Sequence, residues 1–235
     1  MNMRDYETYA RKYPAIIGML IPAIITTELI VTYFPQIEQD WISILAKLGA
    51  FVPVACIYGA LGYFARMLFR DASKALFQFP MFKEDETEMP TTVLLLRTSK
   101  NRLSNSAIDR IAQKVENDFG IKLYSEEEEK NDILEAKRTI VDAVGKMREV
   151  TRSNSILHNY NIDFGFCRNY LGATIYSLAI LVIILFINLA FQIGNWRFTI
   201  GAMVVQILFG VIVYFSLKSK GYSYARALFN AYLSI

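Results

Sequence analysis

Four polar side chains interrupt long apolar stretches of this sequence, and they could do chemistry at membrane depth. They are Glu28, Lys47, Asn188 and Gln206. A charged side chain inside a bilayer is costly unless it is paired or hydrated, so such residues mark structural pairs or polar paths. Glu28 and Lys47 therefore either form an ion pair that fixes two helices or line and gate a polar path.

Asn188 and Gln206 also have two possible roles. With helical spacing, Asn188 shares a face with Thr174 and Ser177, and Gln206 shares a face with Thr199 and Gly210. Such stripes of small and polar residues are typical of helix interfaces and of water-lined pore walls. Both interpretations stay open, and these two residues are the pore-lining candidates in this half of the chain.

A second group of residues could bind an anion. Arg97, Lys100 and Arg102 lie in the polar stretch RTSKNR, just before an expected helix start, where backbone donors and positive charge both favour a phosphate. Arg148 and Arg152 add basic positions on a long helix further along. The stretch predicts a nucleotide or oligonucleotide site, and the alternative is a solvated basic loop that faces anionic lipid.

Residues 160–169 join the polar middle of the chain directly to an apolar stretch, and they are rich in Asn and aromatic side chains. A movement of the middle region would reach the membrane here first. The candidate coupling residues are Tyr160, Asn161, Asp163, Arg168 and Asn169.

Enzyme chemistry is not indicated. The sequence has no glycine-rich phosphate loop, no CxxC pair and no HExxH, and its single histidine, His158, is more typical of a hydrogen-bonded side chain than of a catalyst. Cys56 and Cys167 suggest neither a disulfide framework nor a metal site. We therefore expect no enzyme activity, no cofactor and no metal.

Four apolar stretches position these side chains. About 20 apolar residues in a helix span a bilayer, and residues 15–34, 41–68, 169–192 and 196–217 meet that length. The expected fold class is membrane α-helical, with two transmembrane hairpins and about a hundred polar residues between them. Four spans are too few for a wide pore in one subunit, so a pore would require a homo-oligomer.

The middle region is expected to form a small cytosolic α/β insertion. Residues 91–97 resemble a short buried strand, and residues 121–124 resemble a second one. Between them, Ser104 or Ser106 can cap a helix that Gly120 can end. The order strand, helix, strand predicts an α/β unit.

A long helix should follow. Ser125 and the acidic run 126–129 resemble an N-cap followed by carboxylates at the positive end of the helix dipole, which is a structural role. The helix continues to about Arg152 with apolar residues spaced alternately three and four apart. This face either packs on the strands or joins subunits.

Charge distribution predicts the orientation of the chain. All Lys and Arg residues except Lys47 and Arg197 lie in the polar segments at both ends and in the middle, or at the span ends beside them. Cytoplasmic flanks are enriched in these residues, so both termini and the middle region should be cytoplasmic. The expected organisation is a leader (1–14), hairpin one (15–69), the α/β domain with its long helix (70–168), hairpin two (169–217) and an amphipathic tail (218–235).

This layout resembles a family of small four-span effectors of bacterial anti-phage systems, most closely the channel-forming effectors of the Hailong system. The resemblance rests on the two hairpins, the cytosolic insertion and the segment NYNIDFGFCRN at residues 159–169. It implies a tetrameric ion channel in the bacterial inner membrane, gated by an oligonucleotide from a partner nucleotidyltransferase. Opening would depolarise the membrane and arrest the infected cell.

Two other functions remain possible from the sequence. The chain could be a non-conducting membrane sensor or scaffold that recruits a cytosolic partner, in which case the polar residues of the spans only hold helices together. A small transporter fits the paired hairpins but not the large single insertion between them.

Overall fold

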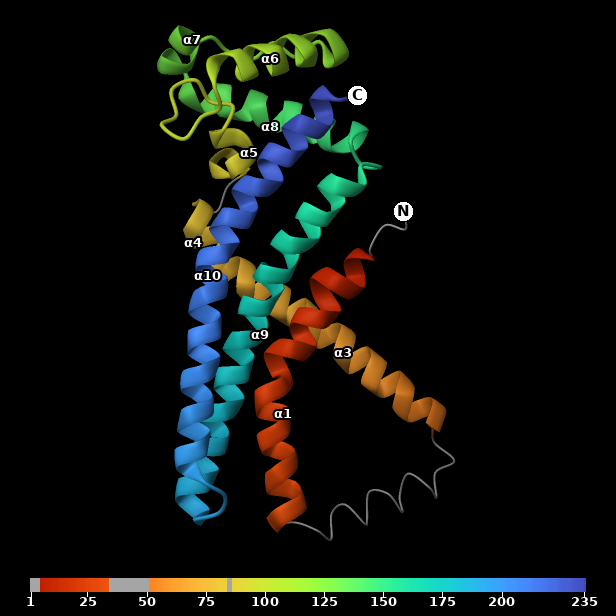
Figure 1. Ribbon diagram of the computed structural model, residues 1–235, viewed down its shortest axis with the longest axis vertical. Helices are drawn as coiled ribbons and strands as arrows, with labels where there is room; N and C mark the ends of the chain where they lie inside the picture. Colours follow the sequence, from red (N-terminus) through yellow and green to blue (C-terminus); the bar gives the residue numbers. More distant parts are fainter. Residues whose placement is uncertain (1–4, 34–50, 84–85) are drawn as a thin grey trace. The chain divides into compact units, whose positions relative to one another are not determined.

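The computed structural model describes residues 5–33, 51–83 and 86–235. Within these ranges the chain is almost entirely helical and contains no β-strand (Figure 1). The described elements are η1 (Glu7–Lys12), α1 (Tyr13–Tyr33), α3 (Phe51–Ser73), η2 (Lys74–Gln78), α4 (Phe79–Phe82), η3 (Glu86–Glu88), α5 (Pro90–Val93), α6 (Asn105–Phe119), α7 (Glu126–Asn131), α8 (Ile133–Val150), α9 (Ser155–Phe191) and α10 (Trp196–Leu233).

Three described helices, rather than the four expected, are long and apolar enough to cross a membrane. These segments are Glu7–Ile30, Ser155–Phe191 and Trp196–Leu233. The expected span at 41–68 begins outside the described residues, and its described part belongs to α3, whose second half carries Arg66 and Arg70. The chain thus fits a membrane α-helical class.

The expected α/β insertion is wrong, because both predicted strands have other structures. Pro90, just before the first of them, begins the short helix α5, which covers the first residues of that stretch. The chain then turns through Leu94, whose carbonyl accepts from the backbone N–H of Leu103 at 2.9 Å. Residues 121–124 are irregular. The apolar run 94–96 is buried against helices, and a buried strand and a buried turn look alike in a short apolar run.

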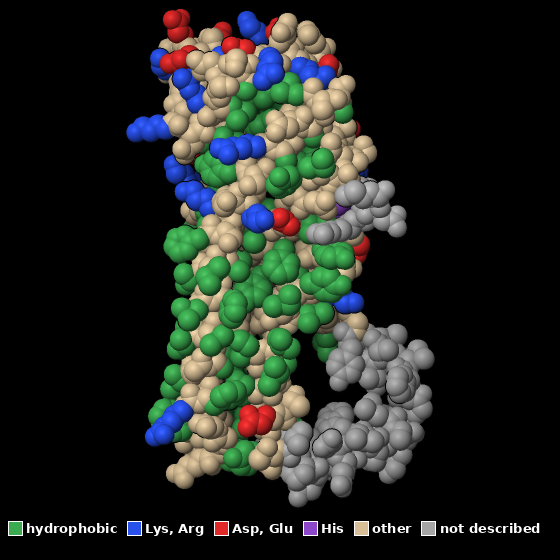
Figure 2. Space-filling view, in the orientation of Figure 1, with side chains coloured by type: hydrophobic (Ala, Val, Ile, Leu, Met, Phe, Trp, Pro, Cys, Tyr) green, Lys and Arg blue, Asp and Glu red, His purple; other side chains and the backbone are tan. Residues whose placement is uncertain are grey.

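The contacts divide the chain into two compact units. We call Gln78–Gly165 with Ser216–Ile235 the polar unit, and Tyr6–Phe77 with Phe166–Phe215 the apolar unit. Charged side chains gather on the polar unit, whereas the apolar unit presents mainly hydrophobic side chains (Figure 2). The helices α9 and α10 contribute residues to both units.

In the polar unit, local capping signals set several helix ends as the sequence predicts, but the single long helix expected from Ser125 to about Arg152 is divided at Asp132 into α7 and α8. Ser104 caps α6 by accepting from Ala107 N–H, and Gly120 ends that helix at φ +68°. The left-handed conformation at Gly120 is one that glycine adopts without a steric cost. Ser125 begins α7 and forms a reciprocal capping box with Glu128.

The C-terminal part of α10 forms much of the polar unit's core. Leu228, Phe229 and Tyr232 are almost completely buried against α6 and α8. The Tyr232 ring stacks on Phe119 with centroids 5.7 Å apart, and its hydroxyl donates to Asp118 at 2.9 Å. The tail expected from the sequence is thus a continuation of α10 and a core element.

In the apolar unit, glycines allow helices to approach closely. A Cβ at Gly172 of α9 would lie 1.8 Å from the carbonyl oxygen of Phe69 in α3. A Cβ at Gly18 of α1 would lie 2.6 Å from the Cβ of Ala173. Close backbone approach at small residues is the usual basis of helix packing in membranes, and here it fixes α1 and α3 against α9.

Candidate functional site

Gln206 is buried where three helices of the apolar unit meet. Its side chain is only 1% exposed, and its amide nitrogen lies 3.3 Å from both the Gly18 carbonyl oxygen and the Thr174 hydroxyl. Gly210, one turn further along α10, packs against the Thr174 methyl group. These contacts use the Gln206 side chain to join α1, α9 and α10 within one subunit.

Asn188 plays a similar role at the turn between α9 and α10. Its side chain is 4% exposed, and its amide lies 2.9 Å from the Thr199 hydroxyl. With the amide oxygen accepting from that hydroxyl, the nitrogen donates to the carbonyl groups of Ile184 and Ile193 at 3.2 and 3.1 Å. Asn188 therefore binds the Ile193 carbonyl in the connection that follows α9, and its contact with Thr199 joins α9 to α10.

Glu28 differs from both amides. It lies on the exposed surface of α1, inside the candidate span, and no hydrogen bond or ion pair joins it to another described residue. Lys47, its expected partner, lies outside the described residues. A surface carboxylate in an apolar helix must be compensated by water, by a cation such as Lys47, or by another chain.

In the predicted anion loop, a carboxylate of the polar unit already occupies backbone donors that a ligand would need. The Glu129 carboxylate, 2% exposed, accepts from the backbone N–H groups of Arg97 and Thr98 at 3.0 and 2.9 Å and from the Thr98 hydroxyl at 3.1 Å. It occupies donors that a phosphate would need. The Arg97 guanidinium also pairs with Asp109 at 2.7 Å.

The other predicted basic residues are dispersed. Lys100 and Arg152 are exposed, and Arg148 lies 3.8 Å from Glu86. No hydrogen bond or ion pair among the described residues joins Arg148 or Arg152 to the loop of Arg97. The structure thus does not gather these residues into one site.

The candidate coupling residues divide between the two units. In the polar unit, Tyr160 is 38% exposed, Asn161 is half-buried, and Asp163 pairs with Lys220 of α10 at 2.7 Å. This ion pair ties the start of α9 to the last third of α10. It is a contact that a movement of either helix would strain.

The remaining coupling residues belong to the apolar unit. Asn169 is buried, and its amide nitrogen donates to the Ala10 carbonyl at 2.5 Å. Arg168 lies near Lys74 of η2, where burial first and then the charges of Arg168 and Arg70 lower the Lys74 pKa. Basic side chains therefore crowd together in this part of the apolar unit.

A basic pocket of the polar unit combines Arg102, a residue expected in an anion site, with residues of α10 that were not expected there. It has a volume of about 440 Å³ and is lined by Asn101, Arg102, Lys218, Tyr222 and Arg226. The last three residues lie at i, i+4 and i+8 of α10 and so share one helix face. That spacing, directly after the apolar stretch ending at Leu217, was a usable signal in the sequence.

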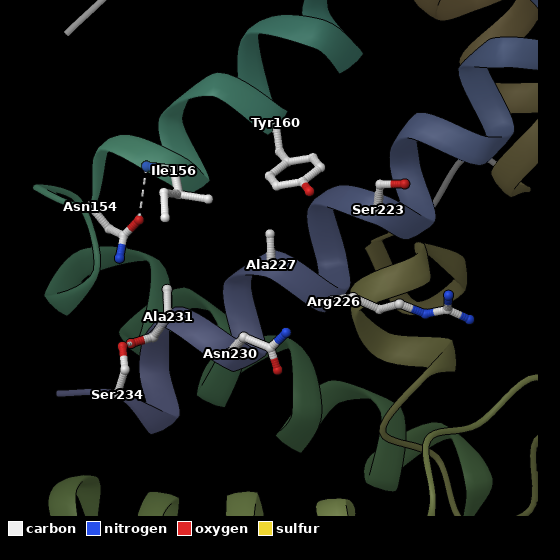
Figure 3. Close-up of a pocket in the computed structure, with 9 residues that line it drawn as sticks. All are labelled: Asn154, Ile156, Tyr160, Ser223, Arg226, Ala227, Asn230, Ala231 and Ser234. Carbon is white, nitrogen blue, oxygen red and sulfur yellow. Dashed lines mark hydrogen bonds between the residues drawn. The ribbon is translucent and has the colours of Figure 1, made fainter.

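A second groove lies beside it, between the start of α9 and the end of α10 (Figure 3). Its volume is about 470 Å³, and Tyr160, Ser223, Asn230 and Arg226 are among its lining residues. Figure 3 shows the Arg226 side chain extending away from Asn154. Arg226 lines both cavities.

In chemical terms the polar unit offers cations, amides and hydroxyls suited to binding an anion. Within the described ranges, no three His, Cys, Asp or Glu side chains gather as metal ligands. Comparison of the chain with family models, with curated proteins and with solved structures gave no match.

Proposed function

We propose that the chain is a subunit of an oligomeric membrane pore that is controlled through its polar unit. The observation that carries this proposal is the exposed Glu28 on a helix long and apolar enough to span a membrane. A carboxylate facing lipid is costly, whereas one facing a water-filled path between subunits keeps its hydration. Glu28 is therefore the pore-lining residue of this proposal.

Asn188 and Gln206 are not part of the proposed pore wall. Both side chains are buried inside the subunit and hydrogen-bonded to groups of the same subunit. Their role in the proposal is to hold α1, α9 and α10 in a fixed arrangement. The face of α1 that presents Glu28 then forms the path.

The proposed location is the bacterial inner membrane, with the polar unit in the cytoplasm. Residues 78–165 and 216–235 form one compact unit, so they lie on the same side of a membrane that α9 and α10 cross. The Lys and Arg residues of this unit favour the cytoplasmic side. The proposal retains a fourth crossing by the chain between α1 and η2, which places both termini in the cytoplasm.

The proposed biological role is defence against phage infection, and it rests on the resemblance to anti-phage effectors. Opening during infection would depolarise the inner membrane, and a nucleotide or oligonucleotide from a partner nucleotidyltransferase would control it. The subunits would form a tetramer.

The membrane potential of cells tests the pore directly. A voltage-sensitive dye is followed while the full chain is expressed with and without its neighbouring gene. We expect depolarisation in one of the two conditions, and a changed extent of depolarisation for Glu28→Gln. Glu127→Gln, which removes one exposed carboxylate from α7 in the polar unit, is the matched control and should behave as the wild type.

A second candidate function is a non-conducting sensor or scaffold. The observation that favours it is the burial of Gln206, because its hydrogen bonds serve helix packing alone. An unchanged potential in both conditions, with the chain shown to be in the membrane, would support the scaffold and overturn the pore.

A further inference from the structure

The basic pocket of the polar unit collects three cations from two distant parts of the chain. Arg102 comes from the loop before α6, and Lys218 and Arg226 come from α10. Among the described residues no acidic side chain lines the pocket, and the Glu126 carboxylate lies just outside it, 3.9 Å from the Arg102 guanidinium. Three positive side chains around one cavity repel one another, so the arrangement favours an anion that neutralises them.

Two of these cations have no described partner. Lys218 and Arg226 are exposed, and neither forms an ion pair with another described residue. Arg102 differs, since its guanidinium donates to the Arg97 carbonyl and lies 3.9 Å from Glu126. Arg102 is therefore held in place, while Lys218 and Arg226 keep their donors available for a ligand.

The uncharged residues that line the basic pocket indicate which class of anion it would bind. Asn101 and Tyr222 supply an amide and a phenol beside the three cations. Multiple donors converging on one small cavity match the several oxygens of a phosphate group better than a single carboxylate. A volume of about 440 Å³ also has room for more than one phosphate.

We propose that Arg102, Lys218 and Arg226 form a binding site for the phosphate groups of an anionic ligand. The site keeps Arg102 of the predicted loop and adds two cations from α10, but it does not use the backbone donors of Arg97 and Thr98, which Glu129 occupies. It rests on the proposed control of a pore by a ligand and gives that ligand a place on α10. Because α10 is continuous from Trp196 to Leu233, a ligand here binds the same helix that crosses the membrane.

Two sources could supply such phosphates, and the neighbouring groove distinguishes them. Lys218 directly follows the apolar stretch of α10, as a residue that meets lipid headgroups would. A soluble nucleotide would also use the groove that shares Arg226, where the exposed ring of Tyr160 can stack on a base and Asn230 can hydrogen-bond to it (Figure 3).

The test measures binding to the full chain in neutral detergent by native mass spectrometry. One probe is a mixed-sequence tetranucleotide, and the other is dioctanoyl phosphatidylglycerol. The pocket variant is Lys218→Gln with Arg226→Gln, since both residues are exposed. The control variant, Lys122→Gln with Lys146→Gln, removes the same charge from exposed positions of the polar unit outside the pocket.

The wild type is expected to bind at least one probe, and the pocket variant should bind it roughly 30-fold or more weakly. For the tetranucleotide, the slope of log affinity against log salt should fall by about 1.4, which corresponds to two lost phosphate contacts. The control should match the wild type. Binding of neither probe to the wild type, or equal losses in both variants, would overturn the proposal.

Tyr160→Ala separates the two sources. A nucleotide ligand should lose about 5-fold or more in affinity without the stacking ring. The lipid probe should be unaffected, because it occupies the basic pocket alone. Binding in detergent does not require a conducting pore. The phosphate site can therefore be confirmed even if the dye experiment shows no depolarisation. Equally, the pore can be confirmed even if this pocket binds neither probe.

Discussion

The two units satisfy buried polar groups in different ways. In the apolar unit the largest buried polar side chains are the amides Asn169, Asn188 and Gln206, which donate to backbone carbonyls or bond to hydroxyls. In the polar unit a buried carboxylate, Glu129, accepts three hydrogen bonds, and Arg97 pairs with Asp109. Amides suit the apolar unit because burying a charge costs far more than burying an amide.

The same comparison distinguishes polar residues that stabilise the fold from polar residues that are available for function. A polar group with complete partners inside its own unit contributes to the fold. Glu28 in the apolar unit, and Lys218 and Arg226 in the polar unit, lack such partners among the described residues. The proposed pore and the proposed phosphate site both rest on these residues.

The largest expected effect tests how the apolar unit packs. Gly172→Val places side-chain atoms against the backbone of Phe69, and we expect it to destabilise the unit by about 3 kcal/mol or more. The measurement is thermal unfolding in detergent. Gly201→Ala is the control, since no atom of the described residues lies within 4 Å of a Cβ there, and a helical Ala should be neutral or stabilising. Equal effects of both changes would show that close approach of α3 and α9 is unimportant.

The next largest effect is expected for Glu129, the buried carboxylate of the polar unit. Glu129→Ala removes the acceptor for Arg97 N–H and Thr98 N–H, and it should cost about 2–3 kcal/mol. Hydrogen exchange of these two amides should also accelerate. The exposed Glu127→Ala should change the unfolding free energy by less than about 0.5 kcal/mol. If both glutamates behaved alike, the acidic run would act through the helix dipole alone.

Local signals in the sequence were sufficient for three of the helix ends, although the break at Asp132 between α7 and α8 was not predicted. Ser104, Gly120 and Ser125 lie where capping requires them, because a cap depends only on residues three or four positions away. The apolar character of the three candidate spans was also visible, since it depends on composition.

Longer-range partners were not predictable in the same way. Glu129 lies 32 positions from Arg97, and the buried Tyr232 lies 114 positions from Asp118. Nothing local marks such a pair, so neither the partner of the Arg97 loop nor the burial of Tyr232 in the amphipathic tail could be inferred from the sequence. The apolar run 94–96 failed as a strand because a tertiary core of helices buries it.

A smaller effect is expected at Gln206. This position tests whether a buried amide of the apolar unit contributes only to helix packing. Gln206→Leu removes the bonds to Gly18 and Thr174 but keeps an apolar side chain, so it should cost about 1 kcal/mol. The measurement is unfolding of the full chain in detergent. In the dye experiment the variant should retain the wild-type depolarisation, because Gln206 is not in the proposed path. Altered depolarisation with unaltered stability would return Gln206 to the pore wall.

The smallest effect is a pH dependence in the polar unit. The Tyr232 hydroxyl bond, and then Lys114, hold the pKa of Asp118 below its ordinary value of 3.8. A carboxyl whose folded pKa is lowered contributes stability above the unfolded pKa and loses it as the pH falls through the folded pKa. Tyr232→Phe should therefore lower stability slightly at neutral pH.

The wild-type and Tyr232→Phe curves of stability against pH should then converge below about pH 4, where Asp118 becomes protonated. All other carboxylates are common to both proteins, so the difference between the two curves isolates the Asp118 bond. The measurement is thermal unfolding in detergent from pH 7 to pH 3. Parallel curves would mean that the hydroxyl contributes through packing in the α6–α10 contact and not through the charge on Asp118.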